Sequence, residues 1–530
     1  MQNRTWTVRM LPGAAALALM ACEGGASGTS DTESAVETDA GSDTDDATGG
    51  SDAGATDVST SEAPETTDAA TTSAGSTGGE PVCGDGQLDD GELCDGAEFG
   101  DQSCVSQGFV DGGELSCTDS CELDVSGCAK CQDWLQQYGT SKGESARAIV
   151  LDQGSDLFIS GSTNGSFEGN PPACSSDAIL SRFSIDGAVL WTRTLGTAEL
   201  DRAHLIATDN AGAIYIAGTT EGAFDGFEFA GGIFDIFVAK YDTDGQQLWV
   251  QQYGTSTDDA PGGLFVDPRG DVYVTGSTAG ALDGATPLGG VDVFITKLDA
   301  NGSRLWTQLY GTEDHDIGFL TPAGAAMDAS GHIVMAGNTR GALVEPPLGD
   351  TDAFVMKFDG EGDVLWTRQV AFPNGDTAYG ASLSSEGHVF LFGGGSGPDE
   401  DLSGVDFWIS KLTADGEDLW SRGYGTEHDD HLHDLVATSD GGFWLVGGSR
   451  GDIDGDNQFE GLMDAFLSRH DESGDVQWVY QLGTPGLDRL LTATVDAVDT
   501  LYSGGSFTGA LPGQEHLGST DAVVVRVCDP

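Results

Sequence analysis

The feature that most constrains this chain is a repeat of nearly constant period that fills residues 132–530. Trp recurs in it at spacings of 57, 58, 57, 60, 54 and 58 residues, and the seven positions are Trp134, Trp191, Trp249, Trp306, Trp366, Trp420 and Trp478. A unit of roughly 40–60 residues that repeats in this way folds into copies of one supersecondary module, and each copy buries its apolar surface against its neighbours. The number of copies therefore sets the architecture.

Two further markers keep a fixed phase with the Trp. An Asp followed by an apolar strand and a base occurs seven times: DAILSR (177–182), DIFVAK (235–240), DVFITK (292–297), DAFVMK (352–357), DFWISK (406–411), DAFLSR (464–469) and DAVVVR (521–526). An acid stands ten residues after every Trp: Glu144, Asp201, Asp259, Asp316, Asp376, Asp430 and Asp488. The unit 201–255 divides into four short strands, A to D, separated by turns, which predicts a β-propeller blade. A total of 80 Gly fits so many tight turns.

The two ends of the repeat are complementary. The strand at 521–527 has no Trp after it, and Trp134 has no Asp-strand before it. We therefore predict an all-β, seven-bladed propeller that is closed by pairing of its N- and C-terminal strands. By alignment of the repeats, Cys131 and Cys528 fall on opposite sides of one hairpin turn, which predicts a disulfide that latches the ring. Cys174 is then the odd cysteine.

The repeat resembles the SBBP-type β-propeller repeat in its YGT…D, GxxYVTGST and DxFVxKxDxxGxxLW segments, which are clearest at 253–306. This resemblance covers 132–530 and implies the same propeller fold. The Gly-to-Trp spacing is also similar to the tryptophan-docking motif of quinoprotein propellers and, less closely, to the Asp-box of sialidases. A sialidase-like site would need a cluster of arginines, and in this sequence the arginines are scattered.

The N-terminus has the form of an export signal. Arg4 and Arg9 precede a short apolar run that ends Leu19-Met20-Ala21-Cys22. This resembles a bacterial lipobox and predicts a signal peptide at 1–21 with lipidation of Cys22; the alternative is an ordinary secretory signal. Acyl chains on Cys22 would anchor the protein to a membrane, and Glu23 favours the outer membrane or cell surface. Residues 22–82 are acidic and rich in Ser, Thr and Gly, which predicts a disordered tether.

Six cysteines crowd into 83–128, within a segment, 83–131, that is too small to have much of a core. We expect three disulfides there, and the sequence does not choose among their pairings. The motifs CGDG (83–86), GELCDG (91–96) and CTDSCELDVSGC (117–128) resemble the small cysteine-rich repeat of myxobacterial-type surface lipoproteins. A zinc site is the rival interpretation, but the spacings are not CxxC pairs and no His lies nearby.

The formal net charge of −66 argues against nucleic acid as a partner, because the phosphate backbone would be repelled. The seven bases that end the Asp-strands (182, 240, 297, 357, 411, 469 and 526) are expected to pair with the seven acids that follow the Trp residues. The alternative is that these acids form a ring of carboxylates that binds a cation at one mouth of the channel.

Two clusters are candidate metal ligands. His428, Asp430, His431 and His433 lie in one irregular segment, and alternation along a strand would place His431 and His433 on one face for a transition metal. Asp452, Asp454 and Asp456 suggest a calcium loop, although the Gly and Glu of an EF-hand are missing. The alternative for both is a solvated acidic loop.

The D–A and B–C loops share one face and vary most in length, so this face is the expected binding face. Its aromatic residues could stack on a sugar or a peptide, or could form small loop cores: Phe167, Phe224, Phe227, Phe229 and Phe459. HExxH and P-loop motifs are absent from the sequence. We expect a monomeric, exported lipoprotein whose propeller binds an extracellular protein or glycan. The alternatives are a hydrolase or lyase acting on polysaccharide in the channel, and a structural surface protein.

Overall fold

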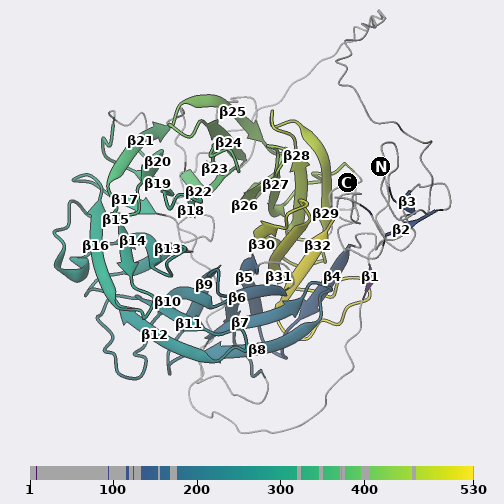
Figure 1. Ribbon diagram of the computed structural model, residues 1–530, viewed down its shortest axis with the longest axis horizontal. Helices are drawn as coiled ribbons and strands as arrows, with labels where there is room; N and C mark the ends of the chain where they lie inside the picture. The colour runs from purple at the N-terminus through teal and green to yellow at the C-terminus, as the bar shows by residue number, and fades with distance from the viewer. Residues whose placement is uncertain are drawn as a thin grey trace, which may run out of the picture. The chain divides into compact units, whose positions relative to one another are not determined.

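The computed structural model describes residues 7–8, 94, 99, 115–118, 123–124 and 133–528, the last range with gaps at 153–155, 168–175, 319–323, 345, 347–349, 371, 373–376, 396–405 and 456–460. Within 133–528, seven antiparallel sheets stand as blades around a central axis (Figure 1). The all-β, seven-bladed propeller predicted from the repeat is confirmed. One 3₁₀ turn, η2 (Leu282–Gly284), interrupts the strands of this range.

The strands of each blade follow chain order from the axis outward. Blade 1 has β5 (Glu144–Leu151), β6 (Asp156–Thr163), β7 (Asp177–Ser184) and β8 (Val189–Leu195), and blade 2 has β9 (Asp201–Thr208), β10 (Ile214–Thr220), β11 (Asp235–Tyr241) and β12 (Gln247–Tyr253). Blade 3 has β13 (Asp259–Val266), β14 (Val272–Thr278), β15 (Asp292–Leu298) and β16 (Arg304–Tyr310). In blade 4 the inner strand is split into β17 (Asp316–Gly318) and β18 (Ala325–Met327), and β19 (Ile333–Thr339), β20 (Asp352–Phe358) and β21 (Val364–Val370) follow.

Blade 5 has β22 (Thr377–Leu383), β23 (Val389–Gly394), β24 (Phe407–Leu412) and β25 (Asp418–Tyr424). Blade 6 has β26 (Asp430–Ala437), β27 (Phe443–Ser449), β28 (Asp464–His470) and β29 (Val476–Leu482). Blade 7 combines β30 (Asp488–Val495), β31 (Leu501–Phe507) and β32 (Asp521–Val527) with β4 (Trp134–Tyr138) as its outer strand, beside which β1 (Thr7–Val8) adds a short parallel strand.

The apolar core lies between the blades. Every residue of β10 is buried, because both faces of its sheet are covered by neighbouring sheets. One cluster joins Tyr215 and Val238 of blade 2 to Val274 and Phe294 of blade 3. The middle strands are therefore apolar on both faces, which removes the alternation expected of a half-exposed strand.

The repeated Trp side chains dock between neighbouring blades, where three of them donate to a carbonyl in the next blade's C–D turn. The indole N–H of Trp249 donates to the Ala300 carbonyl in the C–D turn of blade 3, at 3.2 Å. A Cβ on Gly302 of that turn would stand 3.1 Å from the Trp249 ring, and Gly302 has φ of +83°. Glycine is thus required twice over, by the backbone conformation and by the close approach of the ring.

The ring closes within blade 7. Strand β32 pairs with β4 in an antiparallel register that places Val525 opposite Leu135 and Arg526 opposite Trp134. Cys528 is disulfide-bonded, and its backbone N–H donates to the Asp133 carboxylate at 2.9 Å. Cys131 lies outside the described residues, so its pairing with Cys528 stays a prediction.

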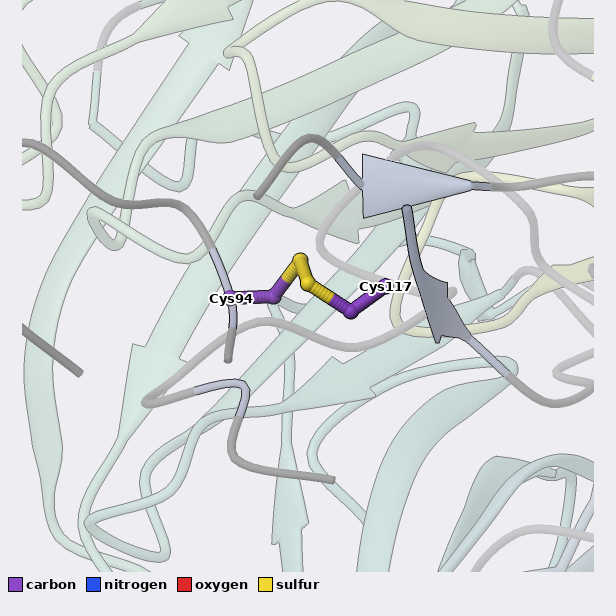
Figure 2. Close-up of a disulfide and its surroundings, with 2 residues drawn as sticks. All are labelled: Cys94 and Cys117. Atoms are coloured by element: carbon purple, nitrogen blue, oxygen red, sulfur yellow. A yellow bond between two sulfur atoms is a disulfide. The ribbon is translucent and has the colours of Figure 1, made fainter. Parts of the chain in front are cut away.

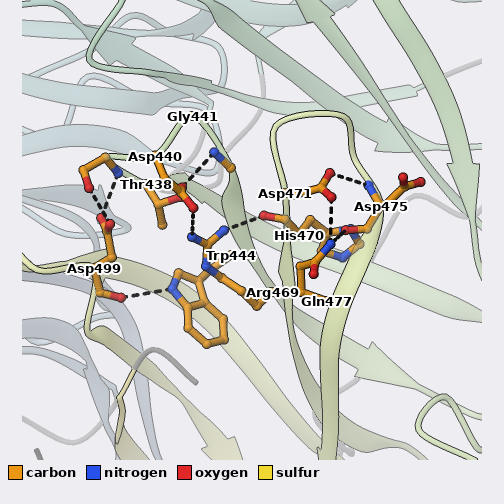
Figure 3. Close-up of polar contacts among 12 residues, drawn as sticks. Thr438, Asp440, Gly441, Trp444, Arg469, His470, Asp471, Asp475, Gln477 and Asp499 are labelled. Carbon is orange, nitrogen blue, oxygen red and sulfur yellow. Dashed lines mark hydrogen bonds and ion pairs between the residues drawn. The ribbon is translucent and has the colours of Figure 1, made fainter. Parts of the chain in front are cut away.

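Six of the seven bases that end the C strands pair with acids at the turn end and not with the acids that follow the Trp residues, contrary to the expectation from the sequence. We call the end of the blade that carries the D–A and B–C loops the loop end, and the end that carries the A–B and C–D turns the turn end. Each C strand begins with its Asp at the loop end and finishes with its base at the turn end. At the turn end Lys297 pairs with Asp271 at 3.1 Å and Arg469 with Asp440 at 2.8 Å. Figure 3 shows Arg469 between Asp440 and the ring of Trp444.

The cysteine-rich segment is a separate unit, of which few residues are described. Cys94 and Cys117 form a disulfide (Figure 2), and β2 (Ser116–Cys117) pairs with β3 (Leu123–Asp124). The structure thus fixes one disulfide pairing among the six cysteines of 83–128, which the sequence had left open. Cys22, the tether and Cys174 lie outside the described residues. Within the described part of the chain, no helix has the length and apolar character needed to cross a membrane.

Candidate functional site

The central channel is narrow and apolar at its middle. A cavity of about 180 Å³ lies there, lined by inner strands of all seven blades, and most of its lining is Ala, Val, Ile and Leu. Asp434 is an acid in this lining. Burial raises the pKa of Asp434 to about 7, although its carboxylate accepts the backbone N–H groups of Leu435 and Ala493 at 2.8 Å.

Six basic side chains, three of them arginines, lie near the loop-end start of the inner strands. They come from the inner strands of four consecutive blades, 6, 7, 1 and 2, and we call them the cationic sector: His431, His433, Arg489, Arg147, Arg202 and His204. Ala148, Leu205 and Asp434, which directly follow three of them, line the cavity. The sector therefore lies immediately beside the cavity, towards the D–A loops.

The electrostatics of the histidines show that the sector is one group. Burial, followed by the charges of Arg489, His431 and Arg147, lowers the pKa of His433 to about 3. Burial lowers the pKa of His204 well below its usual value, and the charges of Arg147 and Arg202 add to this effect. These histidines are neutral near pH 7, because each would place another positive charge beside arginines. An anion in the sector would reverse this bias.

The sector also has acidic neighbours. Asp429 and Asp430 oppose the lowering of the His431 pKa, which burial, Arg489 and Arg450 cause. Asp429 is itself paired with Arg450 at 2.5 Å. Arg202 faces Glu221, whose pKa is raised by burial against the pull of this arginine. The positive charge of the sector therefore comes from its three arginines, and nearby acids offset part of it.

The predicted transition-metal cluster is not assembled. No group of three or more His, Cys, Asp or Glu side chains in the described part of the chain is placed to hold a metal ion, and all four predicted ligands are described. His428 is exposed in a D–A loop. Strand β26 has a bulge between Leu432 and Asp434, so the simple alternation that would place His431 and His433 on one face fails there.

The predicted calcium loop is described only in part. Asp452 accepts the N–H of Gly455 at 2.8 Å, and Asp454 accepts the N–H of Gln481 at 3.1 Å. Asp456 lies outside the described residues. The two described carboxylates therefore support the loop and its neighbouring strand.

The loop aromatics are mainly small cores. Phe224 is buried and contacts Phe237 edge-on, with ring centroids 5.5 Å apart. Phe167 and Phe227 pack against clusters of their blades. Phe229 is half-buried, and Phe459 lies outside the described residues.

Sequence reasoning missed the arginines of the site. They are 55 and 287 residues apart along the chain, at 147, 202 and 489, and look scattered. Alignment of the inner strands would have shown these residues at two equivalent positions. Arg202 and Arg489 directly follow the repeated acid, while Arg147, His204 and His433 stand three residues after it. Closure of the ring brings blades 7 and 1 together, and this makes the arginines neighbours.

Comparison with protein families gives one match: the model described as a beta-propeller repeat (SBBP) matches residues 248–282. The regulatory protein FlaEY of Caulobacter vibrioides is 24% identical over 384 residues, which cover 65% of this chain. The match spans 40% of the length of that relative.

Several solved structures match the chain at low identity. Puromycin hydrolase is 13% identical with a TM-score of 0.43, covering 74% of this chain and 55% of its own. YCF48 bound to D1 peptide is 12% identical with a TM-score of 0.40, covering 75% and 95%. The Pan2 WD40 domain of Neurospora crassa is 11% identical with a TM-score of 0.35, covering 62% and 90%.

Proposed function

We propose that the protein is an exported lipoprotein, held at the outer membrane or cell surface through Cys22, and that its propeller binds the anionic group of an extracellular glycan or protein. The observation that carries the binding proposal is the cationic sector. A chain with 87 acidic and 21 basic residues places three arginines and three histidines beside one cavity. Such a concentration of positive charge attracts an anion against the field of the whole protein.

The loop end suits recognition. Arginine offers a planar fork of donors that matches carboxylate, sulfate and phosphate groups. Because a bound anion raises the pKa of His204, His431 and His433, binding takes up protons. Affinity therefore increases as the pH falls.

The second candidate function is a hydrolase or lyase with its site in the channel. Asp434, with a pKa of about 7, follows His433 at the cavity, and perturbed titratable groups in a cavity are typical of catalytic sites. Turnover of an acidic polysaccharide would favour this candidate.

The test is titration of the purified chain with glucuronate and, separately, inorganic phosphate, followed by calorimetry. The variants Arg147→Gln and Arg489→Gln should each weaken binding by about 10- to 100-fold, since a charge-assisted hydrogen bond contributes roughly 1.5–3 kcal/mol. Arg193→Gln is the control, because Arg193 lies on the outer strand β8 and donates to the Asp244 carbonyl. Equal affinity in all three variants would refute the site. Thermal unfolding shows whether each variant is folded.

A further inference from the structure

Blade 7 differs from the other blades in the charge of the loops beside it. The two D–A loops that flank it, at 483–487 and 139–143, have the sequences GTPGL and GTSKG and contain no acid. The equivalent loops between blades 1 and 2, 2 and 3, 3 and 4, and 5 and 6 are GTAEL, GTSTD, GTEDH and GTEHD, and each exposes at least one acid. The remaining loop, 371–375, also lacks an acid but lies largely outside the described residues. Two adjacent D–A loops without acids therefore flank blade 7 in a protein with 87 acidic residues.

Exposed aliphatic side chains lie beside these two loops. Leu462, in the B–C loop of blade 6, is 68% exposed, more than any other large apolar side chain in the described part of the chain. Its backbone N–H donates to the Gly486 carbonyl at 2.9 Å, next to the exposed Pro485. Leu517, in the B–C loop of blade 7, is 42% exposed. Apolar side chains that gather in this way on a surface mark a place where a partner binds.

Hydrogen bonds join these loops into one surface. The B–C loop of blade 7 begins beside one D–A loop, where the Leu487 N–H donates to the Thr508 hydroxyl at 2.6 Å. It ends beside the other D–A loop, where the Ser519 N–H donates to the Lys142 carbonyl at 2.9 Å. The surface is thus formed before a partner arrives, which lowers the entropic cost of binding. We call it the blade 7 surface, and it consists of residues 139–143, 461–463, 483–487 and 508–520.

The blade 7 surface contacts the cationic sector. Arg489 follows Leu487 by two residues, and its Nε lies 3.3 Å from Sδ of Met463, the neighbour of Leu462. The surface itself has one exposed acid, Glu515, and one exposed lysine, Lys142. An acidic group on a ligand that covers this surface would therefore lie beside an arginine and away from the acids of the other D–A loops.

A protein segment fits this surface better than a glycan or a membrane does. The exposed apolar side chains are aliphatic, whereas the described loop aromatics that could stack on a sugar ring are buried or half-buried, Phe224 among them. A charged polysaccharide or an anionic membrane would extend beyond blade 7 and meet Glu427 on one side and Glu199 on the other, which would repel it. A protein segment can place one acidic side chain between aliphatic ones, as protein interfaces with an apolar core and complementary charges do.

We propose that the blade 7 surface binds a protein segment in which an acidic side chain stands between aliphatic side chains. The acid would pair with Arg489, and the aliphatic side chains would pack on Leu462 and Leu517. This proposal rests on the proposed binding of an anionic group, and it names a protein rather than a glycan as the carrier of that group.

Selection from a phage library of random peptides, with the purified full chain as bait, tests the proposal. Enriched peptides should carry Asp or Glu flanked by Leu, Ile or Val, and one of them, made synthetically, serves as the probe. Leu462→Ser should weaken binding of the probe about tenfold, since a leucine loses its apolar contact, and should leave glucuronate binding unchanged. Leu248→Ser is the matched control, because Leu248 is 50% exposed on the outer strand β12; it should bind the probe as tightly as the unmodified protein.

A second variant adds the charge that the other D–A loops carry. Lys142 stands where Glu199 stands in the loop between blades 1 and 2, so Lys142→Glu is a change that an equivalent loop already accommodates. It should weaken binding of the probe by more than about tenfold at low salt, and by less in about 0.5 M sodium chloride. Lys142→Gln should have an intermediate effect, and thermal unfolding shows whether each variant is folded.

The proposal would be overturned by a selection that enriches no peptide or enriches peptides without an acid. Equal affinity of the probe for Leu462→Ser, Lys142→Glu and the unmodified protein would overturn it too. So would tighter binding of alginate or of phosphatidylglycerol vesicles than of every peptide. If glucuronate still binds in these cases, the anion site stands and its assignment to a protein partner fails; if glucuronate does not bind either, the proposed function fails with it.

Discussion

At the turn end of the propeller, buried bases neutralise acids, whereas at the loop end acids face other acids. Lys297 at the turn end lies 3.1 Å from Asp271 and 4.7 Å from the centre of the Tyr273 ring. At the loop end, Asp259 and Asp235 face one space, and their mutual repulsion adds to the burial that raises the pKa of Asp259. One repeated motif thus builds two electrostatic environments about one strand length apart.

This difference indicates at which end of the propeller the electrostatic interactions can change most when a ligand binds. The turn end is satisfied internally by ion pairs and by cations over aromatic rings. The loop end instead carries pairs of acids between blades and the cationic sector at the channel. Ligands and ions therefore have more to contribute at the loop end.

The largest effect is expected for Asp406→Asn, measured as stability against pH in the presence of chelator. Burial, then the charges of Asp430 and Asp429, raise the pKa of Asp406 from 3.8 to about 6. The folded state therefore binds the proton more tightly than the unfolded state, and stability falls as the pH rises from about 4 to 6. At roughly 1.4 kcal/mol per pKa unit, this loss amounts to about 2–3 kcal/mol at pH 7, and the variant should not show it.

Denaturant unfolding at several pH values between 4 and 7 provides the measurement, with Asp415→Asn as control. The whole chain repels itself more strongly as the pH rises, so only the difference between variants isolates Asp406. A variant with the same slope as the unmodified protein would contradict the repulsion between Asp406 and Asp430.

Arg469→Met should have a smaller effect, with the opposite dependence on pH. Burial alone would raise the pKa of Asp440, but hydrogen bonds from Thr438 and Arg469 outweigh it and hold this pKa below 3.8. Such an acid adds stability above its unfolded pKa, and this stability is lost as the pH falls. We expect a loss of roughly 1–2 kcal/mol at pH 7, because the Asp440 side chain is 59% exposed and regains water.

Equilibrium unfolding at pH 7 and pH 3 measures this effect. Arg469→Lys is the control, since it keeps the charge and loses the fork of donors; it should fall between the two. If Arg469→Met and the unmodified protein differ equally at both pH values, the pairing with Asp440 contributes nothing.

The fold could be predicted from the sequence because the repeat fixes it locally. Trp, Asp-strand and acid recur in phase, and the unmatched halves at Trp134 and Val525 predict the closure that the register confirms. The expected pairing of the C-strand bases with the acids after the Trp residues could also have been excluded from the sequence. Lys240 lies five residues along an extended strand from Asp235, and therefore at the opposite end of the blade from Asp259. Once the strands are arranged antiparallel, the sequence shows at which end of the blade each residue lies.

The site could not be predicted in the same way. Arg147 and Arg489 become neighbours when the ring closes, and no local pattern marks them. His433 looked like a metal ligand because regular alternation was assumed, and the bulge after Leu432 removes that alternation.

The smallest effect is expected for Arg450→Met, which removes an ion pair at the loop end. The side chains of Arg450 and Asp429 are 49% and 33% exposed, so water already screens their attraction, and the expected loss is below about 1 kcal/mol. Sodium chloride at about 0.5 M should remove most of the difference from the unmodified protein in denaturant unfolding. A loss that exceeds that of Arg469→Met would show that the loop end depends on this pair for its counter-charge. A small, salt-sensitive loss instead shows that water and salt already screen this exposed pair.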